Sequence, residues 1–338
     1  MIGMRISTIM CNQTWPSLRI SNVSLDNMPF HRQPPKMDKL VVVMGATGAG
    51  KSRLSVDLAT HFGGEIVNSD KIQVYKGLDV ATNKITEEER CGIRHHLLGA
   101  IDPHKEFTAS NFCDMASLAI NSITCRGKLP IIVGGSNSFI EALIYDKTYE
   151  LYTRYNFCFL WVDVSMHVLN SFLTKRVDKM IEKGLVNEVR NIFNPKNEDY
   201  SKGIRKAIGV PEFDRYFRAE SSNSIDEETR IKLLEEAINE VKINNCKLAS
   251  QQLEKIKRLI NVKGWNVHRL DATEVYTKRG NEEEVMVEEL WKNLVVGQSK
   301  RIVDRFLCEN YKSSMGCSSD GTAINRAILT TAAASYYY

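Results

Sequence analysis

The sequence predicts an α/β fold, in which helices flank a parallel sheet and a smaller helical lobe follows at the carboxyl end. From Asp38 onward, short runs of apolar and β-branched residues alternate with helical patterns, as expected when crossover helices join parallel strands. The 338 residues are 43% hydrophobic and 25% charged, which provides enough apolar side chains for a sizeable core. We therefore expect one main domain with a helical appendage.

The expected strands and helices follow one another in a regular order. A buried strand is expected at residues 39–44. A helix begins near Lys51 and ends at Gly63 and Gly64, where glycine permits left-handed backbone. A second strand follows at once at residues 65–68, and the sheet should contain at least four parallel strands. Further strands are expected at residues 129–133, 157–164 and 267–270, and further helices at residues 109–125, 167–193, within 226–262 and at 282–295.

Composition divides the chain into four parts. Residues 1–37 contain one acidic side chain, Asp26, among scattered arginines, serines and threonines, which is typical of an organelle transit peptide or a disordered leader. Residues 38–225 form the expected α/β core, and residues 226–305 a helical region that closes back on it. Residues 306–338 are rich in Ser, Gly, Ala and Tyr and are expected to be a disordered tail.

Composition also excludes several classes of protein. The net charge of +4 is small and dispersed, and it does not indicate a polyanionic partner. The eight cysteines are scattered, with neither a Cys-x-x-Cys pair nor a Cys/His spacing suited to zinc, so we expect reduced thiols. The longest apolar runs fall far short of the roughly 20 residues that cross a bilayer, and we expect no membrane span.

A glycine-rich segment connects the first strand directly to the first helix. It matches the phosphate-loop pattern G-x-x-x-x-G-K-[ST] at every fixed position, so the fold class is expected to be P-loop NTPase-like. Backbone N–H groups of such a loop surround a diphosphate, Lys51 adds a positive charge, and the Ser52 hydroxyl is placed to bind Mg²⁺. A nucleoside triphosphate there would indicate a kinase or NTPase, and a prenyl diphosphate a transferase. The residues are Gly45, Ala46, Thr47, Gly48, Ala49, Gly50, Lys51 and Ser52.

An acidic residue, Asp70, follows the second strand and should emerge beside the phosphate loop at the carboxyl edge of the sheet. A carboxylate at this place can meet an acceptor molecule. Taken alone it does not decide the chemistry, because small-molecule kinases of the same architecture also place an aspartate there to hold an acceptor hydroxyl. Asp70 as a helix N-cap is the structural alternative.

Several segments that occur in a fixed order along the chain indicate a family. Together they resemble the adenine isopentenyltransferases, and most closely the plant adenylate isopentenyltransferases that make cytokinins. The resemblance extends from about Lys39 to Thr273. The segments are residues 45–52, 69–75 (SDKIQVY), 95–98 (HHLL), 130–136 (PIIVGGS), 176–180 (RVDKM) and 204–213 (IRKAIGVPEF).

The resemblance implies roles for individual residues. The phosphate loop would bind the diphosphate of dimethylallyl diphosphate, and Asp70 would be the general base for the N6 amine of adenine, whose lone pair is delocalised into the purine. Thr47 would face the bridging oxygen of the leaving diphosphate. Arg176 would bind its phosphates, with a surface ion pair as the alternative role for this arginine.

Other residues match the family less closely. Thr82 and Lys84 align with residues on the acceptor side, and Arg205 aligns with a basic pocket residue. Asp163, at the end of the fourth strand, would influence bound Mg²⁺ indirectly or cap the next helix. The pair His95 and His96 matches a family motif, and we expect it to be a hydrogen-bonding scaffold. Gly134, Gly135 and Ser136 would give a ligand room to approach the third strand, or form a plain tight turn.

The acceptor implied by the resemblance is free AMP, ADP or ATP, with ADP and ATP preferred, as is typical of the plant members. Family members that modify transfer RNA carry a long helical insertion where this chain has only residues 146–156, and eukaryotic ones often add a zinc finger. A transfer RNA enzyme and a P-loop kinase remain the alternatives. The helical region 226–305 would cover the nucleotide. We expect a monomer in the plastid, with the cytoplasm as the alternative compartment.

Overall fold

The computed structural model describes residues 37–221, 226–279 and 282–308. The expected leader and most of the expected tail lie outside these residues. The strands are β1 Asp38–Gly45, β2 Gly64–Asn68, β3 His95–His96, β4 Leu129–Val133, β5 Tyr155–Asp163 and β6 Val267–Asp271. The helices are α1 Lys51–Phe62, α2 Ala109–Cys125, α3 Asn137–Tyr145, α4 Leu151–Arg154, α5 Met166–Glu182, α6 Leu185–Arg190, the 3₁₀ helix η1 Gly203–Lys206, α7 Asp214–Ser221, α8 Glu227–Asn261, α9 Thr273–Lys278, α10 Glu284–Trp291, the π-helix η2 Lys292–Val296 and α11 Gly297–Cys308.

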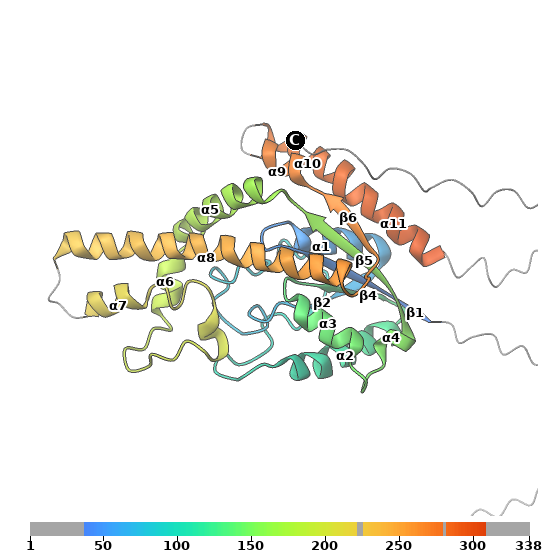
Figure 1. Cartoon of the computed structure of the whole chain (residues 1–338), viewed down its shortest axis with the longest axis horizontal. Helices are drawn as coiled ribbons and strands as arrows, with labels where there is room; N and C mark the ends of the chain where they lie inside the picture. The colour runs from blue at the N-terminus through green and yellow to red at the C-terminus, as the bar shows by residue number, and fades with distance from the viewer. Residues whose placement is uncertain (1–36, 222–225, 280–281, 309–338) are drawn as a thin grey trace, which may run out of the picture. The chain divides into compact units, whose positions relative to one another are not determined.

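All strands belong to one sheet, in the order β3-β2-β4-β1-β5-β6, and neighbouring strands are parallel (Figure 1). The register places Val43 of β1 beside Val133 of β4 and Leu160 of β5. The predicted α/β class with a parallel sheet is confirmed. Because the strands are parallel, their carboxyl ends share one edge, where the following loops meet.

Alternate residues of the central strand pack against different layers of helices. Val41 and Val43 belong to the core shared with α1, η2 and α11, whereas Leu40 and Val42 belong to the core shared with α2, α3 and α8. This period of two is the geometry of a strand that is buried on both faces. The helices after β6 therefore cover the same face as α1, while α8 covers the opposite face.

One expected helix is divided in the structure. The helical pattern of residues 167–193 predicts a single helix, but α5 ends at Glu182 and α6 begins at Leu185. Gly184 lies between them with φ of 94°, in the left-handed region that glycine adopts without a steric penalty, so the prediction of one continuous helix is wrong. The sheet also gains a short edge strand, β3, that the sequence pattern did not predict.

The longest helix, α8, extends over 35 residues within the helix-rich region predicted from residue 226 (Figure 1). Its N-cap is Asp226, whose carboxylate accepts a hydrogen bond of 2.7 Å from the Thr229 amide. Its buried positions recur every three or four residues, which gives one continuous stripe facing the core. Among the described residues no helix has the length and apolar character of a membrane span.

A buried carboxylate connects the amino-terminal ends of β2 and β4. Glu65 is 3% exposed and pairs with His96 at 2.7 Å, Arg126 at 2.6 Å and Lys128 at 2.9 Å. Burial opposes its ionisation, but the hydrogen bonds from His96 and Lys128 and the charge of Arg126 outweigh burial and lower the pKa of Glu65 to about 2. His96 thus has the scaffold role expected from the sequence.

Replacing Glu65 by glutamine is expected to lower the free energy of unfolding at pH 7 by about 1–3 kcal/mol, because Arg126 and Lys128 lose the anion that they share. A depressed pKa stabilises the fold fully above the ordinary value of 4.5, and this contribution is lost as the pH falls toward 2. Urea denaturation should therefore show that the difference in free energy of unfolding between the wild type and the variant becomes smaller between pH 6 and pH 3. A deficit that is the same at both pH values, or an equal deficit in Glu87→Gln at an exposed ion pair, would contradict this account.

Candidate functional site

The candidate site lies where β2, β4 and β1 end side by side. These strands end at Asn68, Val133 and Gly45, and the segments that follow them include Asp70, the Gly134–Gly135 turn and the phosphate loop. The Ser69 amide donates a 2.7 Å hydrogen bond to the Val133 carbonyl, which joins the first two of these segments. The sheet order thus brings together motifs that are far apart in the sequence.

The phosphate loop adopts a conformation that depends on its glycines. Gly48 and Gly50 have φ of 80° and 92°, values that residues with a Cβ rarely adopt. Helix α1 begins directly after them at Lys51, and the first N–H groups of a helix have no partner within the helix. The loop therefore presents backbone donors and the positive end of a helix dipole, which together favour an anion such as diphosphate.

Lys51 lies buried within the loop. Its Nζ donates a 2.7 Å hydrogen bond to the Ala46 carbonyl. The pKa of Lys51 is lowered to about 8. Burial is the main cause, the nearby charge of Arg176 lowers the pKa as well, and the charge of Asp70 partly opposes both. Because both charges act on the same amine, Lys51, Asp70 and Arg176 form one electrostatic group.

The lowered pKa of Lys51 makes anion binding depend on pH. The amine carries its charge below about pH 8 and loses it above. The affinity of the wild type for inorganic diphosphate should therefore exceed that of Lys51→Met by a constant factor below pH 8, and this factor should shrink at higher pH. Calorimetric titration of both proteins between pH 6.5 and 9.5 measures the ratio, in which the titration of diphosphate itself cancels. A ratio that stays constant up to pH 9.5 would contradict the assignment.

Thr47 and Arg176 meet across the loop. The Arg176 guanidinium, on α5, lies 3.4 Å from the Thr47 Oγ1 and donates a 2.9 Å hydrogen bond to Asn245 Oδ1 on α8. Burial lowers the pKa of Arg176 to about 10, so the side chain stays charged at neutral pH. No carboxylate pairs with this arginine in the described part of the chain, and its buried Nε has no hydrogen-bond partner there. The alternative of a surface ion pair is therefore wrong.

Asp70 follows β2 in a tight turn. Its Oδ1 accepts hydrogen bonds from the amides of Ile72 at 2.9 Å and Gln73 at 3.3 Å. The aspartate caps a turn, because no helix begins at this point, so the N-cap alternative is wrong. The second oxygen, Oδ2, has no hydrogen bond to any described residue, which leaves it available as an acceptor.

The turn after β4 fits closely against Asp70. A Cβ on Gly134 would lie 2.2 Å from Ser69 Oγ, 2.6 Å from the Ser69 carbonyl carbon and 2.8 Å from the Asp70 amide nitrogen. Gly134 therefore allows the two strand ends to approach each other. The expected room for a ligand is therefore filled at Gly134 by the protein backbone of Ser69 and Asp70.

Three further expected residues, Thr82, Lys84 and Arg205, lie in two other segments and are partly buried. Thr82 Oγ1 donates to the Leu78 carbonyl at 2.6 Å. The Thr82 carbonyl accepts from the side-chain amide of Gln73, and the backbone amide of Gln73 donates to Asp70. Lys84 pairs with Asp79 at 2.7 Å. Thr82 is thus connected to the Asp70 turn. In contrast, Arg205 donates to the carbonyls of Asn197 at 2.7 Å and Asp199 at 3.1 Å, and within the described residues it forms no hydrogen bond with the phosphate loop or Asp70.

The elements after β6 support the phosphate loop from its other side, which sequence reasoning missed. Tyr276 of α9 donates a 2.7 Å hydrogen bond to the Gly48 carbonyl. Trp291 of α10 lies against Gly50, where a Cβ would come within 2.7 Å of the indole ring, and its Nε1 donates to Asp57 of α1 at 3.1 Å. These contacts depend on pairs of residues more than 200 positions apart, so no local pattern predicts them.

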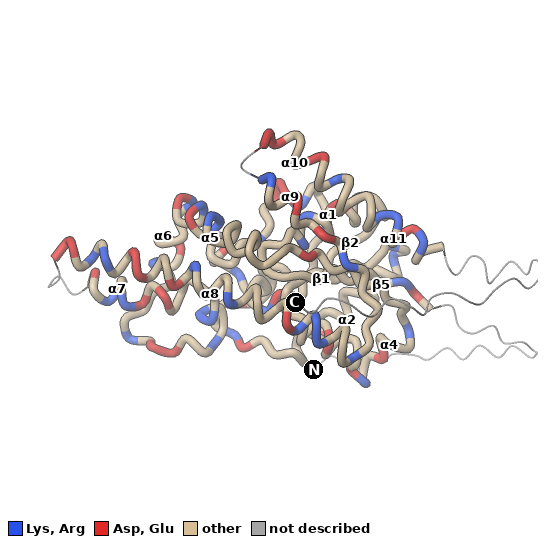
Figure 2. The backbone as a smooth tube through the Cα atoms, turned by 45° about the horizontal axis from the view of Figure 1, so that its top comes forward, with Lys and Arg blue, Asp and Glu red and all other residues tan. Residues whose placement is uncertain are grey.

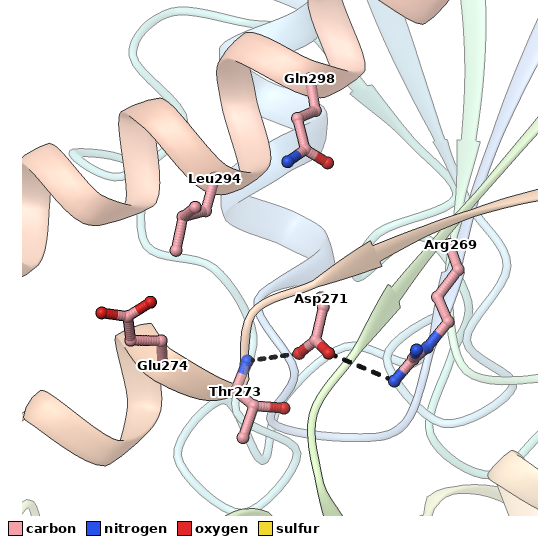
Figure 3. Close-up of a pocket in the computed structure, with 6 residues that line it drawn as sticks. All are labelled: Arg269, Asp271, Thr273, Glu274, Leu294 and Gln298. Carbon is pink, nitrogen blue, oxygen red and sulfur yellow. Dashed lines mark hydrogen bonds and ion pairs between the residues drawn. The ribbon is translucent and has the colours of Figure 1, made fainter.

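Arg269, Asp271 and Thr273 line a hollow beside β6 (Figure 3), and Arg269 also contacts Asp163. Arg269 donates to Asp163 at 2.7 Å and to Asp271 at 3.3 Å, and the Asp271 carboxylate also accepts from the Thr273 amide at 2.9 Å. Asp163 is therefore neutralised by an arginine. Its expected influence on Mg²⁺ remains a prediction, with this ion pair as its observed role.

Comparison with known proteins identifies the family. A family model described as IPP transferase matches residues 73–151 and 145–258. Adenylate isopentenyltransferase 3, chloroplastic, from Arabidopsis thaliana is 52% identical over 315 residues, which cover 90% of this chain and 91% of that protein. The chain belongs to the adenylate isopentenyltransferase family. The resemblance seen in the sequence motifs is confirmed.

Other comparisons agree with membership of the adenylate isopentenyltransferase family. Adenylate isopentenyltransferase 5, chloroplastic, from Arabidopsis thaliana is 55% identical over 282 residues, 83% of each chain. The solved structure of the full-length transfer RNA isopentenylpyrophosphate transferase from Bacillus halodurans superposes with a TM-score of 0.61 at 25% identity, covering 80% of this chain and 99% of that one. The P-loop NTPase-like fold class is confirmed.

Proposed function

We propose that the protein transfers the dimethylallyl group of dimethylallyl diphosphate to N6 of the adenine of ATP, ADP or AMP, releasing diphosphate, in cytokinin biosynthesis. The observation that carries this proposal is the meeting of three groups at one sheet edge in a member of this family. They are an anion-binding loop with Lys51, the charged Arg176, and the carboxylate of Asp70 with one free oxygen. Transfer from an allylic diphosphate to an amine needs all three.

In the proposed reaction, the N6 lone pair forms a bond to C1 of the dimethylallyl group, and the bond from C1 to the diphosphate oxygen breaks. The electron pair of the broken bond leaves with diphosphate. Asp70 Oδ2 accepts the N6 proton, while Oδ1 stays hydrogen-bonded to the Ile72 and Gln73 amides, which hold the carboxylate in place. Loss of this proton makes the amine lone pair available for attack.

Negative charge grows on the diphosphate as the bond to carbon breaks. The loop amides, Lys51 and Arg176 are donors fixed in place before the reaction, and Thr47 adds a hydroxyl beside the Arg176 guanidinium. Fixed donors stabilise a developing anion strongly because they need no reorganisation during the step. These groups therefore assist departure of the diphosphate.

Mg²⁺ fits the same loop. The Ser52 carbonyl accepts from Ser55 at 2.7 Å, but the Ser52 hydroxyl has no hydrogen bond to a described residue. In the described part of the chain, no cluster of three or more His, Cys, Asp or Glu side chains could hold a metal. Magnesium commonly combines few protein ligands with substrate phosphates and water, so Ser52 would hold it together with the diphosphate. Bound there, it would neutralise phosphate charge.

Free nucleotides are the proposed acceptors, with ADP and ATP preferred. Only residues 146–150 and the short helix α4 separate α3 from β5, so a separate RNA-binding lobe has no place at this point. Figure 2 shows Lys and Arg interleaved with Asp and Glu along α5, α7 and α8, which differs from the basic stripe expected for RNA binding. Both features favour a small acceptor.

The test is a direct assay of the purified protein with Mg²⁺ and dimethylallyl diphosphate. AMP, ADP, ATP and unmodified transfer RNA are offered in parallel, and prenylated adenine is detected by mass spectrometry. The proposal expects product with the free nucleotides, more with ADP and ATP than with AMP. Product on RNA alone would place the enzyme among the transfer RNA transferases, and ATP consumption without prenylation would indicate a kinase.

We also propose that the protein acts in the plastid. The composition of residues 1–37 is that of a transit peptide, and the two Arabidopsis relatives described above carry the word chloroplastic in their names. The cytoplasm is the alternative compartment.

A further inference from the structure

Helix α8 contains two amide side chains in its otherwise apolar buried stripe. Asn245 and Gln252 are 6% and 7% exposed, and Ala249, which lies between them on the same face, is fully buried. Spacings of four and three residues place all three on one side of the helix. Buried amides destabilise a fold unless they are hydrogen-bonded, so the partners of these two explain why they are there.

Gln252 fixes the backbone of the phosphate loop. Its side-chain Oε1 accepts a 2.6 Å hydrogen bond from the Thr47 amide, and its backbone carbonyl accepts a 3.2 Å hydrogen bond from Asn137 Nδ2. Its Nε2 lies against Gly135, where a Cβ would be only 2.2 Å away. One glutamine thus joins α8, the phosphate loop and the turn after β4.

Asn245 fixes the arginine. Its Oδ1 accepts the 2.9 Å hydrogen bond from Arg176, and its Nδ2 donates at 2.9 Å to the carbonyl of Val241, one turn earlier on α8. The second bond sets which way the amide faces, so the oxygen points toward the guanidinium. Among hydrogen bonds to described residues, Arg176 would keep only its long contact of 3.4 Å to Thr47 if Asn245 were absent.

We propose that Gln252 and Asn245 are positioning residues that set the placement of Thr47 and Arg176 against the leaving diphosphate, an inference that rests on the proposed function. Because the Thr47 amide already donates its hydrogen to Gln252 Oε1, the Thr47 hydroxyl is the group that can face the diphosphate. Asn245 accepts a hydrogen bond from one guanidinium nitrogen of Arg176, Nη2, and the other guanidinium nitrogens can then donate to phosphate oxygens. A single rigid helix therefore sets the distance between the two groups.

The test compares variants that keep or remove each acceptor oxygen at similar side-chain volume. Gln252→Met and Asn245→Leu remove it, and we expect kcat to fall by about 10- to 100-fold, with the KM for ADP changing less than threefold. Gln252→Glu and Asn245→Asp keep an acceptor oxygen, and their kcat should exceed that of the matching Met or Leu variant by at least about fivefold. This rescue would not occur if the amides only filled space.

The matched control is Asn244→Leu on the same helix. Asn244 is partly buried and donates to Glu212 at 2.7 Å, without contact to the loop or Arg176. Its loss should lower the melting temperature while kcat stays within about twofold of the wild type. The proposal is overturned if Asn244→Leu loses as much kcat as the other two, or if folded Gln252→Met and Asn245→Leu keep the wild-type kcat.

Binding of inorganic diphosphate, measured by calorimetry, separates this proposal from the proposed function because it needs no group transfer. We expect affinity five- to tenfold weaker in Gln252→Met and Asn245→Leu and unchanged in Asn244→Leu. A wild type that binds diphosphate in this pattern but prenylates no acceptor would contradict the proposed function alone. Equal diphosphate affinity in all variants would contradict the positioning roles alone.

Discussion

Replacement of Asp70 by asparagine is expected to lower kcat by about 10²- to 10⁴-fold while the protein stays folded, because the amide cannot accept the N6 proton. The turn should survive, since an asparagine oxygen can still accept from the Ile72 and Gln73 amides that now bond to Oδ1. Product formation with ADP at saturating dimethylallyl diphosphate measures the change, and thermal unfolding reports on the fold.

The control for this substitution is Asp102→Asn. Asp102 caps a turn in the same way, by accepting from the His104 amide at 2.9 Å, and its side chain forms no hydrogen bond with a described residue of the site. The two variants should therefore differ in kcat and resemble each other in melting temperature. If Asp70→Asn retains kcat within threefold of the wild type, Asp70 is not the base.

Replacement of Gly134 by alanine is expected to reduce kcat by at least 10²-fold and to destabilise the fold by about 1–3 kcal/mol. The added methyl group would overlap Ser69 and the Asp70 amide, so the strand end that carries Asp70 must move. Displacement of a catalytic group by about 1 Å is enough for an effect of this size. Kinetics with ADP and urea denaturation measure the two changes.

A second substitution distinguishes backbone displacement from a side-chain clash. Ser69→Ala removes the Oγ that would lie 2.2 Å from the new methyl group, but the contacts with the Ser69 carbonyl carbon and the Asp70 nitrogen remain. The double variant Ser69→Ala/Gly134→Ala should therefore stay as inactive as Gly134→Ala. Recovery of activity in the double variant would show that only the hydroxyl was in the way.

The sequence predicted the parts of the site that local chemistry determines. The phosphate loop follows from glycine spacing, and the place of Asp70 follows from a carboxylate directly after a buried strand, because parallel strands end at one edge. The prediction of one long helix at residues 167–193 was wrong because the apolar periodicity continues through Gly184. The left-handed φ of Gly184 is a conformation that periodicity does not report.

The supports of the site were not predicted, because they depend on packing between distant segments. Gln252 and Asn245 lie 205 and 69 residues from their partners Thr47 and Arg176. A signal was present all the same, since both residues interrupt the apolar stripe of α8 at positions that keep its spacing of three and four. Buried amides within such a stripe are worth noting as groups that need specific partners.

The supports of the phosphate loop also determine when it can form during synthesis. The loop is made near the start of the chain, yet Gly48 bonds to Tyr276 and Gly50 packs against Trp291. A nascent chain leaves the ribosome amino terminus first, so the loop emerges long before these partners exist. The donor site can therefore reach its final shape only when translation is nearly complete, and a chain that stops before Trp291 would carry an intact phosphate-binding motif without the tertiary contacts that hold it in place.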